Sequence, residues 1–287
     1  MIDLHTHTNE SDGSLSPAEL VARAAAMGLE ALAICDHDTL AGFDKAVPAA
    51  QAARLDLVCG IELSTKLETQ PGVRPKTVHL LGYFLNGPAP DSFRQWLGSI
   101  QQARRDRNRR LVEKLNRLGV AITLEEVEAI GRNLTGRPHF AQVMLAKGYV
   151  SSVQQAFDEY LDESAKAYVY REEPSFAEGV RRIRQAGGLT SLAHPLRLMK
   201  NRDGEFDALL AQLVETGLDA LEVYYSEHGP QDVARFLDLA RRYGLAVTGG
   251  SDFHGKAKPH IELGRGLAGN LSIPKRVLDE LRARVSR

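Results

Sequence analysis

Short apolar runs alternate with amphipathic segments along most of this chain. In the first forty residues, an apolar run at 2–5 precedes a loop, and Ser16-Pro17-Ala18-Glu19 then has the pattern of a helix N-terminus. The apolar runs that we interpret as strands are seven in number, at 2–5, 31–36, 57–62, 77–84, 189–194, 219–225 and 245–251. Strands that alternate with helices predict a parallel α/β sheet, here a seven-stranded barrel.

Helical periodicity occupies most of the spaces between these strands. The predicted helices cover about 16–27, 40–54, 174–187, 203–217, 229–243 and 274–286. Between Phe84 and Pro174 the alternation stops, and only helical periodicity remains, at roughly 90–118, 123–131, 138–147 and 151–162. We therefore predict a helical insert over 87–172, placed after the fourth strand and over the catalytic face, and a catalytic barrel made of 1–86 and 173–287.

Side chains of the kinds that bind metals stand at or just after the ends of six apolar runs. They are His5, His7, Asp12, His37, Glu62, His79, His194, Asp252 and His254. In barrels of alternating strands and helices, active sites form at the carboxyl ends of the strands. Residues two apart in a strand face the same side, so His5 and His7 can approach one ion together. Burying this many titratable groups together is costly without cations, and the pattern therefore predicts a metal centre.

The mixture of imidazoles and carboxylates favours Mn, Fe or Zn over Mg or Ca. Nine ligands are too many for one ion, so we expect three divalent ions, manganese first, with iron and zinc as alternatives. Three such ions, three carboxylates and a bridging hydroxide leave a charge of about +2, which a phosphate monoester dianion neutralises. A neutral amide would leave that charge uncompensated. The charge balance therefore favours hydrolysis of a phosphate ester over hydrolysis of a C–N bond.

Composition limits the classes of function. The 287 residues carry a formal net charge of −1, so no overall positive field attracts nucleic acid or an anionic membrane. Cys35 and Cys59 both lie within apolar runs, which argues against a disulfide scaffold. The first residues lack the pattern of a signal peptide, and no window approaches the ~20 apolar residues of a membrane span. We expect a cytoplasmic enzyme with no membrane contact and no obligate protein partner.

The motifs around these residues resemble those of the PHP family, named for polymerase and histidinol phosphatase domains. The resemblance covers essentially all of the barrel, through His5-Thr6-His7, Asp36-His37-Asp38-Thr39, Gly60-Ile61-Glu62, Ala193-His194-Pro195 and Ser251-Asp252-Phe253-His254. It implies a distorted seven-stranded barrel with a trinuclear metal site. The implied ligand sets are His5, His7, Glu62 and Asp252 for one ion, Glu62, His79 and His194 for the second, and Asp12, His37 and His254 for the third.

Within the family, the chain is most similar to nucleoside 3′,5′-bisphosphate phosphatases and to related enzymes that trim short 5′-phosphorylated RNA from the 5′ end. This resemblance implies that a metal-bridging hydroxide removes the 3′-phosphate of a small nucleotide to leave the 5′-monophosphate, with short RNA as a second substrate. The residues expected to act in catalysis are Glu62, His194, Asp252 and Arg197. Histidinol phosphatase is the nearest rival, which an acidic pocket for the ammonium group of its substrate would favour.

Six residues are expected to bind the substrate. They are Ser14, Arg107, Asn108, Arg137, His139 and Arg197. Arg197 follows the His194 motif at the catalytic rim, where a guanidinium can bind phosphate through two hydrogen bonds. Arg107 and Asn108 belong to an arginine-rich helix whose alternative role is a solvated face. Arg137 and His139 resemble phosphate or general-acid contacts of one PHP subgroup, and a capping turn is the alternative.

Two other classes of protein remain to be weighed. A regulatory protein that reads nucleic acid through the insert would need only a closed structural site with fewer ligands than this chain offers. An amidohydrolase often places a carbamylated lysine at the fourth strand, where this chain has His79. Of the carboxylates beside His37, we expect Asp36 to orient a ligand, and Asp38 either to do the same or to cap the next helix.

Overall fold

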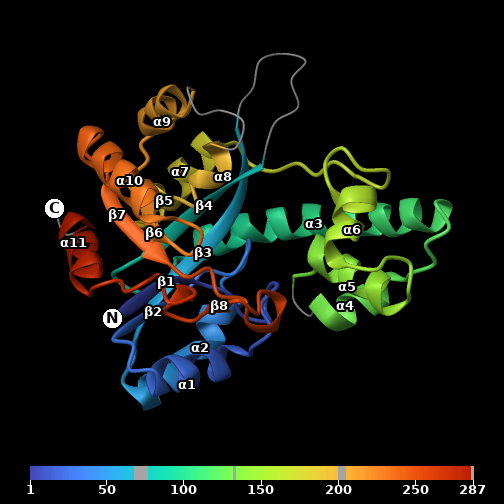
Figure 1. Ribbon diagram of the computed structural model, residues 1–287, viewed down its shortest axis with the longest axis horizontal. Coiled ribbons are helices and arrows are strands. Elements are labelled where there is room, and N and C mark those ends of the chain that lie inside the picture. The colour runs from blue at the N-terminus through green and yellow to red at the C-terminus, as the bar shows by residue number, and fades with distance from the viewer. Residues whose placement is uncertain (68–76, 132–133, 200–204, 286–287) are drawn as a thin grey trace.

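A nearly closed seven-stranded sheet forms the centre of the computed structural model, which describes residues 1–67, 77–131, 134–199 and 205–285 (Figure 1). In spatial as in chain order, the strands are β1 (Ile2–Thr6), β2 (Ala31–Ile34), β3 (Asp56–Lys66), β4 (Thr77–Phe84), β5 (Leu189–Leu192), β6 (Ala220–Tyr225) and β7 (Ala246–Gly250). The two edges approach each other, since Asp252 donates its backbone N–H to His5 and His7 donates to Phe253. The predicted seven-stranded barrel is thus confirmed.

Helices surround this sheet where the periodicity predicts them. They are α1 (Pro17–Ala26), α2 (Ala41–Ala53), α7 (Phe176–Gln185), α9 (Phe206–Glu215), α10 (Pro230–Arg242) and α11 (Arg276–Val285), with the single turns α8 (Leu196–Met199) and η2 (Gly255–Ala257). Residues 203 and 204 of one predicted helix, and 286 of another, lie outside the described residues. The expected capping box of α1 forms, because the Glu19 carboxylate accepts the Ser16 N–H at 2.8 Å. Across the described part of the chain, no helix has both the length and the apolar character needed to cross a bilayer.

The expectation of an entirely parallel sheet is wrong at β4. This strand pairs antiparallel with both β3 and β5, while the remaining pairs are parallel. Only residues 67–76 separate β3 from β4, and a parallel crossover needs about a dozen residues or more. Because β4 runs in the opposite direction to the other strands, its beginning lies at the rim where the other strands end. His79, near the start of β4, therefore reaches the same rim as ligands that follow other strands.

A second difference concerns β3, which continues through Lys66. Glu62 therefore lies within a strand rather than at its end, and it is buried. A strand that extends past its neighbours carries this carboxylate over the mouth of the barrel. A short hairpin of β8 (Ile261–Glu262) and β9 (Gly266–Leu267) lies after β7.

Apolar side chains close the end of the barrel where the parallel strands begin. Leu4 of β1, Tyr83 of β4 and Ala220 of β6 belong to one buried cluster, which Leu278 and Leu281 of α11 cover. The Tyr83 hydroxyl donates to the Leu4 carbonyl at 2.9 Å, so its polar atom is satisfied inside this cluster. The polar ligand-type residues are left at the opposite end.

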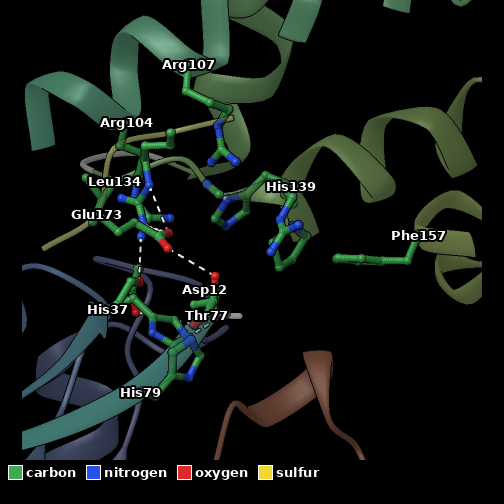
Figure 2. Close-up of a pocket in the computed structure, with 16 residues that line it drawn as sticks. Asp12, His37, Thr77, His79, Arg104, Arg107, Leu134, His139, Phe157 and Glu173 are labelled. Carbon is green, nitrogen blue, oxygen red and sulfur yellow. Dashed lines mark hydrogen bonds and ion pairs between the residues drawn. The ribbon is translucent and has the colours of Figure 1, made fainter. Parts of the chain in front are cut away.

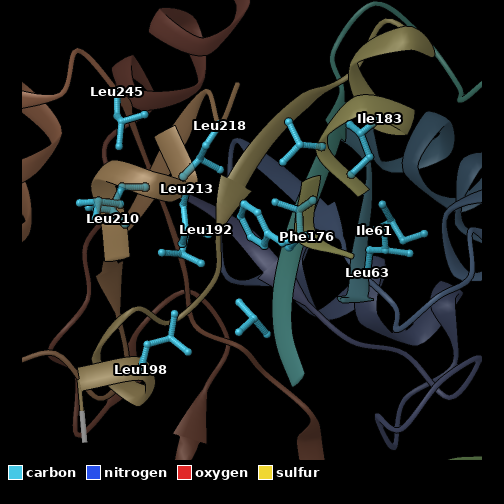
Figure 3. Close-up of a cluster of buried hydrophobic side chains, with 14 of the residues drawn as sticks. Ile61, Leu63, Phe176, Ile183, Leu192, Leu198, Leu210, Leu213, Leu218 and Leu245 are labelled. Atoms are coloured by element: carbon cyan, nitrogen blue, oxygen red, sulfur yellow. The ribbon is translucent and has the colours of Figure 1, made fainter. Parts of the chain in front are cut away.

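The outer face of the sheet packs against helices. Figure 3 shows Phe176 and Ile183 of α7 beside Ile61 and Leu63 of β3, within the largest buried apolar cluster. Leu210 belongs to the same cluster and extends it toward α9. This packing holds β3, and with it Glu62, in a fixed position.

The segment between β4 and α7 is helical, as predicted. It contains α3 (Asp91–Arg117), α4 (Leu124–Gly131), α5 (Arg137–Ala146), α6 (Val153–Ala156) and the π-helical turn η1 (Phe157–Leu161). Helices α4 to α6 gather around the far part of α3, to one side of the barrel (Figure 1). Phe93 and Leu97 of α3 pack into the large cluster of the barrel, whereas Leu111 and Leu115 pack into a separate cluster among the later helices. Helix α3 thus joins two cores.

Candidate metal centre

All nine side chains expected to bind metal lie close together at one end of the barrel. Within the described residues, three groups offer ligand atoms that all lie within 4.8 Å of one another. These groups are His5, His7, Glu62 and Asp252; His7, Asp12, His37 and His254; and His37, Glu62 and His79. His194 joins them through Glu62, since its Nε2 atom lies 2.9 Å from Glu62 Oε1. The groups share members, as expected for adjacent ions.

Glu62 is the centre of this arrangement. Its Oε2 atom lies 3.1 Å from His7 Nε2 and 3.3 Å from His37 Nδ1. Its Oε1 atom faces the other side, 2.7 Å from His79 Nδ1 and 2.9 Å from His194 Nε2. The two oxygens of one carboxylate therefore face different sets of imidazoles, which is the geometry of a bridging ligand between two cations.

Several buried ring nitrogens at this site lie near carboxylate oxygens but make no hydrogen bond to them. His5 Nε2, both ring nitrogens of His7 and His37 Nδ1 are buried without a hydrogen bond. Buried polar groups normally have partners, and each exception calls for an explanation such as an ion. The donor set of imidazoles and carboxylates suits divalent transition metals. These residues therefore fit a metal centre.

Electrostatics also suit cations. Burial alone would raise the pKa of the Glu62 carboxyl, but His79, His37 and His5 hold it well below its ordinary value. Burial lowers the pKa of His37 and that of His194 to about 3, so both imidazoles are neutral near pH 7 and have a lone pair to donate. Burial would lower the pKa of His5 and that of His7, but neighbouring carboxylates raise the first well above its ordinary value and the second to about 9. Ligation requires neutral imidazoles, so these two rings would release protons when an ion binds.

Glu222 is a functional residue that the motif pattern did not indicate. It is fully buried on β6, and its carboxylate lies 2.8 Å from His5 Nδ1 and accepts the backbone N–H of His194 at 2.6 Å. A carboxylate on the second ring nitrogen fixes the orientation and tautomer of a ligating histidine. The available signal was a lone carboxylate inside the apolar run Ala220-Leu221-Glu222-Val223.

The two oxygens of Asp252 also have separate partners. Oδ1 lies 3.3 Å from His7 Nε2, while Oδ2 accepts from the Tyr225 hydroxyl at 2.7 Å and from Lys258 Nζ at 2.6 Å. Asp252 and His194 both adopt positive φ angles, 56° and 31°, which are uncommon outside glycine. Strained residues of this kind tend to occur where the surrounding structure holds a functional side chain in place. Neither Tyr225 nor Lys258 was expected from the sequence.

Asp36 holds the loop that carries Asp12. Its carboxylate accepts from the Thr8 backbone and hydroxyl at 2.8 and 2.7 Å, and from the Ser11 hydroxyl at 2.6 Å. The pKa of Asp36 is raised, because burial outweighs these hydrogen bonds and the neighbouring His7. Asp36 therefore affects the candidate ligands by fixing the position of this loop.

A cavity opens beside these ligands and extends under the helices that follow β4 (Figure 2). The barrel contributes Asp12, His37 and His79 to its wall. The helical segment contributes basic and apolar side chains, namely Arg104, Arg107, Leu134, Arg137, Pro138, His139, Phe157 and Arg171. One hollow thus joins the candidate metal ligands to a strongly basic wall.

Comparison with known proteins places this site in a family. Residues 3–175 match the model of the PHP domain. The chain belongs to the PHP family. It is 34% identical to a 5′-3′ exoribonuclease of Haemophilus influenzae over 92% of this chain and 93% of that protein. It is 31% identical to a 3′,5′-nucleoside bisphosphate phosphatase of Chromobacterium violaceum over 92% of this chain and 90% of that protein.

A solved structure extends the similarity to the fold of this PHP protein. A chain from Bifidobacterium adolescentis, assigned as a metal-dependent phosphoesterase, is 33% identical and superposes with a TM-score of 0.82, over 99% of this chain and 96% of that one. Together with the buried ligand groups, these relatives identify the PHP protein as a metal-dependent phosphoesterase, a hydrolase.

The residues expected to bind substrate lie in different places in this PHP structure. Arg107, Arg137 and His139 line the cavity. Asn108 lies behind Arg107, where its side chain accepts from Arg107 Nε and donates to the Thr135 carbonyl, both at 2.9 Å. Ser14 is exposed, and its hydroxyl oxygen accepts the Lys256 N–H at 2.8 Å.

Arg197 does not line this cavity. It donates to the Tyr225 hydroxyl at 2.6 Å and to Glu227 at 2.8 Å, and it lies 3.6 Å from Asp252 Oδ2. His139 accepts the Gly136 N–H on Nδ1 at 2.9 Å, so the capping turn weighed for this motif is present while the ring also faces the cavity. Capping and substrate contact are therefore compatible at His139.

Asp38 takes neither of the roles expected for it. Helix α2 begins after Leu40 without a side-chain cap, and Asp38, at φ 51°, turns its carboxylate toward the helical segment. There it pairs with Arg104 of α3 and with Arg171, and it accepts the Ser64 N–H at 2.7 Å. Burial would raise the pKa of Asp38, but the two guanidinium groups hold it well below its ordinary value.

Proposed function

We propose that this PHP phosphoesterase removes the 3′-phosphate of nucleoside 3′,5′-bisphosphates and leaves the 5′-monophosphate. The observation that carries the proposal is an excess of buried positive charge in the cavity, beside a metal centre suited to one phosphate. A substrate with two phosphates would use both features. The relative from Chromobacterium violaceum is named for this activity.

The excess is found by counting the charges of the cavity wall. Apart from the candidate ligand Asp12, the described part of the cavity wall contains one carboxylate, Glu173. It contains four guanidinium groups, those of Arg104, Arg107, Arg137 and Arg171. Glu173 and the neighbouring Asp38 pair with Arg171, and Asp38 also pairs with Arg104. Two carboxylates thus face four guanidinium groups, which leaves two positive charges for an anion.

Two arginines of this wall make their hydrogen bonds to neutral groups. Arg107 donates from Nε to the Asn108 amide, and Arg137 donates to the Leu161 carbonyl at 3.1 Å. Burial, then repulsion from Arg104 and Arg171, lowers the pKa of Arg107 well below its ordinary value. Arg104 Nε is buried without a hydrogen bond. A phosphate dianion would supply the missing acceptors and relieve this repulsion.

The metal ligands would take the sets implied by the family resemblance, with Glu62 as the bridge. When bound, divalent ions, manganese first, lower the pKa of water so that hydroxide can attack phosphorus, and offset charge that develops on the phosphate. Glu222 holds His5 and the His194 backbone in place for this arrangement. Arg197, held beside Asp252 by the Tyr225 hydroxyl, would contact the phosphate whose ester bond is cleaved.

The remaining predicted residues would support the metal centre and the basic wall. Asn108 positions Arg107 through its side-chain oxygen. Ser14 would offer its hydroxyl proton at the edge of the third ligand group, beside His254, whose carbonyl accepts the Ser14 N–H. The segment 87–172 would serve as the substrate-covering insert on a catalytic barrel of 1–86 and 173–287, since it supplies the basic wall.

Short 5′-phosphorylated RNA is the second candidate substrate, and one observation favours it. A smaller hollow lies beside Arg107 and Arg137, lined also by the cations Lys66 and Arg171 and by the carboxylates Glu163 and Glu173. Lys66 of this hollow would offer a cation to the next phosphate of a longer chain. The relative from Haemophilus influenzae is named as a 5′-3′ exoribonuclease. Histidinol phosphate is disfavoured, because its ammonium group would meet guanidinium groups.

The test is a side-by-side kinetic comparison on manganese-loaded protein. Adenosine 3′,5′-bisphosphate should be hydrolysed at the 3′ position at least roughly tenfold more efficiently than adenosine 3′-monophosphate, because charge-assisted contacts to a second phosphate contribute ~1.5–3 kcal/mol. Histidinol phosphate and a 5′-phosphorylated tetraribonucleotide complete the panel, and product analysis locates the cleaved bond. Equal rates on mono- and bisphosphate, or a preference for histidinol phosphate, would contradict the assignment.

The basic wall predicts which arginines distinguish these substrates. Arg107→Gln and Arg137→Gln should each lower kcat/KM for the bisphosphate roughly ten- to hundred-fold, while kcat/KM for the 3′-monophosphate changes little. The matched control is Arg109→Gln on the same helix, since Arg109 is exposed and pairs with Asp106. Losses of equal size on both substrates would mean that these arginines support the fold rather than the second phosphate.

A further inference from the structure

Part of the cavity wall is apolar, on the side away from the metal ligands. Phe157 forms this side of the wall. In Figure 2, Phe157 points from its helix into the cavity toward His139, while His37 and His79 lie across the hollow. Arg104 and Arg107 reach the same hollow from the helix above it. A ligand whose phosphates bind at the metals and at the basic wall would therefore present its remaining part to Phe157.

The local backbone explains how Phe157 reaches this position. Helix α6 ends at Ala156, and Phe157 begins the π-helical turn η1. Such turns are rare and frequently occur at functional sites, because the extra residue changes the direction of the side chains. Ala156 and Leu161 on either side are fully buried in the cluster of the helical segment, which anchors the turn. Phe157 itself is half-buried and packs against the same cluster, so its ring is supported from behind.

We infer that Phe157 is the stacking surface for the nucleobase of the substrate. This inference rests on the proposed function. It adds the nucleobase to the two phosphates as a third part of the substrate that the enzyme recognises. Stacking on an aromatic ring is available to every base, because each base has a π face. A stacking wall therefore gives a preference for nucleosides over base-free sugar phosphates with little discrimination among bases.

The decisive experiment removes the aromatic ring and compares ligands with and without a base. The ligands are adenosine 3′,5′-bisphosphate and methyl ribofuranoside 3,5-bisphosphate for kinetics, and adenosine 5′-monophosphate and methyl ribofuranoside 5-phosphate for calorimetric binding. Phe157→Leu keeps the apolar packing and should raise KM and Kd for the adenosine compounds about tenfold, as expected for the loss of one stacked base. Values for the base-free compounds should not change. Phe157→Trp should retain wild-type affinity for the adenosine compounds.

The matched control is Tyr160→Leu in the same turn. Tyr160 also packs against the cluster of the helical segment but does not belong to the cavity wall, so its replacement should affect both ligand classes equally or not at all. Equal binding of the two monophosphates by the wild type, or a Phe157→Leu loss of equal size on both, would overturn the inference. If the wild type hydrolyses neither bisphosphate, the proposed function fails, and the binding comparison still decides whether a base stacks on Phe157.

Discussion

Replacing Glu62 with Gln is expected to lower kcat roughly a thousandfold, because a metal-bridging carboxylate supports several kcal/mol of charge stabilisation and each ~1.4 kcal/mol is a factor of ten. Glu62 faces His7 and His37 through one oxygen and His79 and His194 through the other. The amide has nearly the same shape but no negative charge, and its NH₂ group cannot donate an electron pair to an ion. Metal content should therefore fall together with turnover. Steady-state kinetics and elemental analysis on the same protein preparation measure both quantities.

Glu10→Gln is the matched control for this variant. Glu10 is also buried in the rim of the barrel, but its carboxylate accepts from Lys45 at 2.8 Å and belongs to none of the candidate ligand groups. This variant should keep wild-type metal content. Wild-type turnover and metal content in Glu62→Gln would exclude a bridging role. A loss of the same size in Glu10→Gln would point to a general disturbance of the rim.

Alternation of strands and helices was sufficient to predict the barrel, because burial of a strand on both faces produces a continuous apolar run whichever way the strand points. For the same reason, the run at 77–84 carries no information about direction, and the antiparallel course of β4 was missed. The length of the connection contained that information, since residues 67–76 are too few for a parallel crossover, which needs about a dozen. His79 reached the expected cluster through a strand direction opposite to the one assumed.

The positioning residues were harder to predict than the candidate ligands. A histidine or an aspartate after an apolar run suggests chemistry by its place at a strand end. Glu222 lies inside its strand, and its role depends on His5, which is 217 positions away in the sequence. Pairing over such a separation appears only when the strands are placed in space. Strand periodicity alone does not contain it.

Helical spacing could have grouped the buried arginines of α3, but the prediction included only Arg107 among them. Arg104, Arg107 and Asn108 are buried, whereas Arg109 and Arg110 are exposed. Residues three and four apart share one face of a helix, so Arg104 belongs with Arg107 and Asn108 by spacing alone. Arg171 lies in an irregular segment without periodicity, and its pairing with Asp38 was not predictable from spacing.

The ion pairs of Asp38 join the barrel to the helical segment and are the basis of a stability prediction. Asp38 is completely buried, as are most of the side chains of Arg104 and Arg171. Asp38→Asn would keep the volume, leave Arg104 without a carboxylate and leave Arg171 paired with Glu173 alone. Removing one partner of a buried ion pair costs about 3–5 kcal/mol of unfolding free energy. For a chain of this size, each kcal/mol corresponds to roughly 2–4 °C, so Tm should fall by about 10 °C.

The pH dependence of this loss has a definite sign. The folded-state pKa of Asp38 lies well below its ordinary value, because Arg104 and Arg171 favour the ionised form. A group with a depressed pKa stabilises the fold fully above its unfolded pKa, about 3.9 for aspartate, and loses that contribution as pH falls toward the folded value. The difference in unfolding free energy between wild type and Asp38→Asn should therefore be constant from about pH 8 to pH 5 and shrink below about pH 4. Urea unfolding at a series of pH values measures it.

An exposed aspartate–arginine pair provides the matched control. Asp44 accepts two hydrogen bonds from Arg94, at 2.7 and 2.9 Å, but its side chain is 47% exposed, against 0% for Asp38. Exposed pairs contribute about 0–1 kcal/mol, so Asp44→Asn should lower Tm by only a few degrees. The number of hydrogen bonds is similar in the two pairs, and burial is the main difference. Equal losses of stability in the two variants would show that burial of Asp38 is not what makes its ion pairs important.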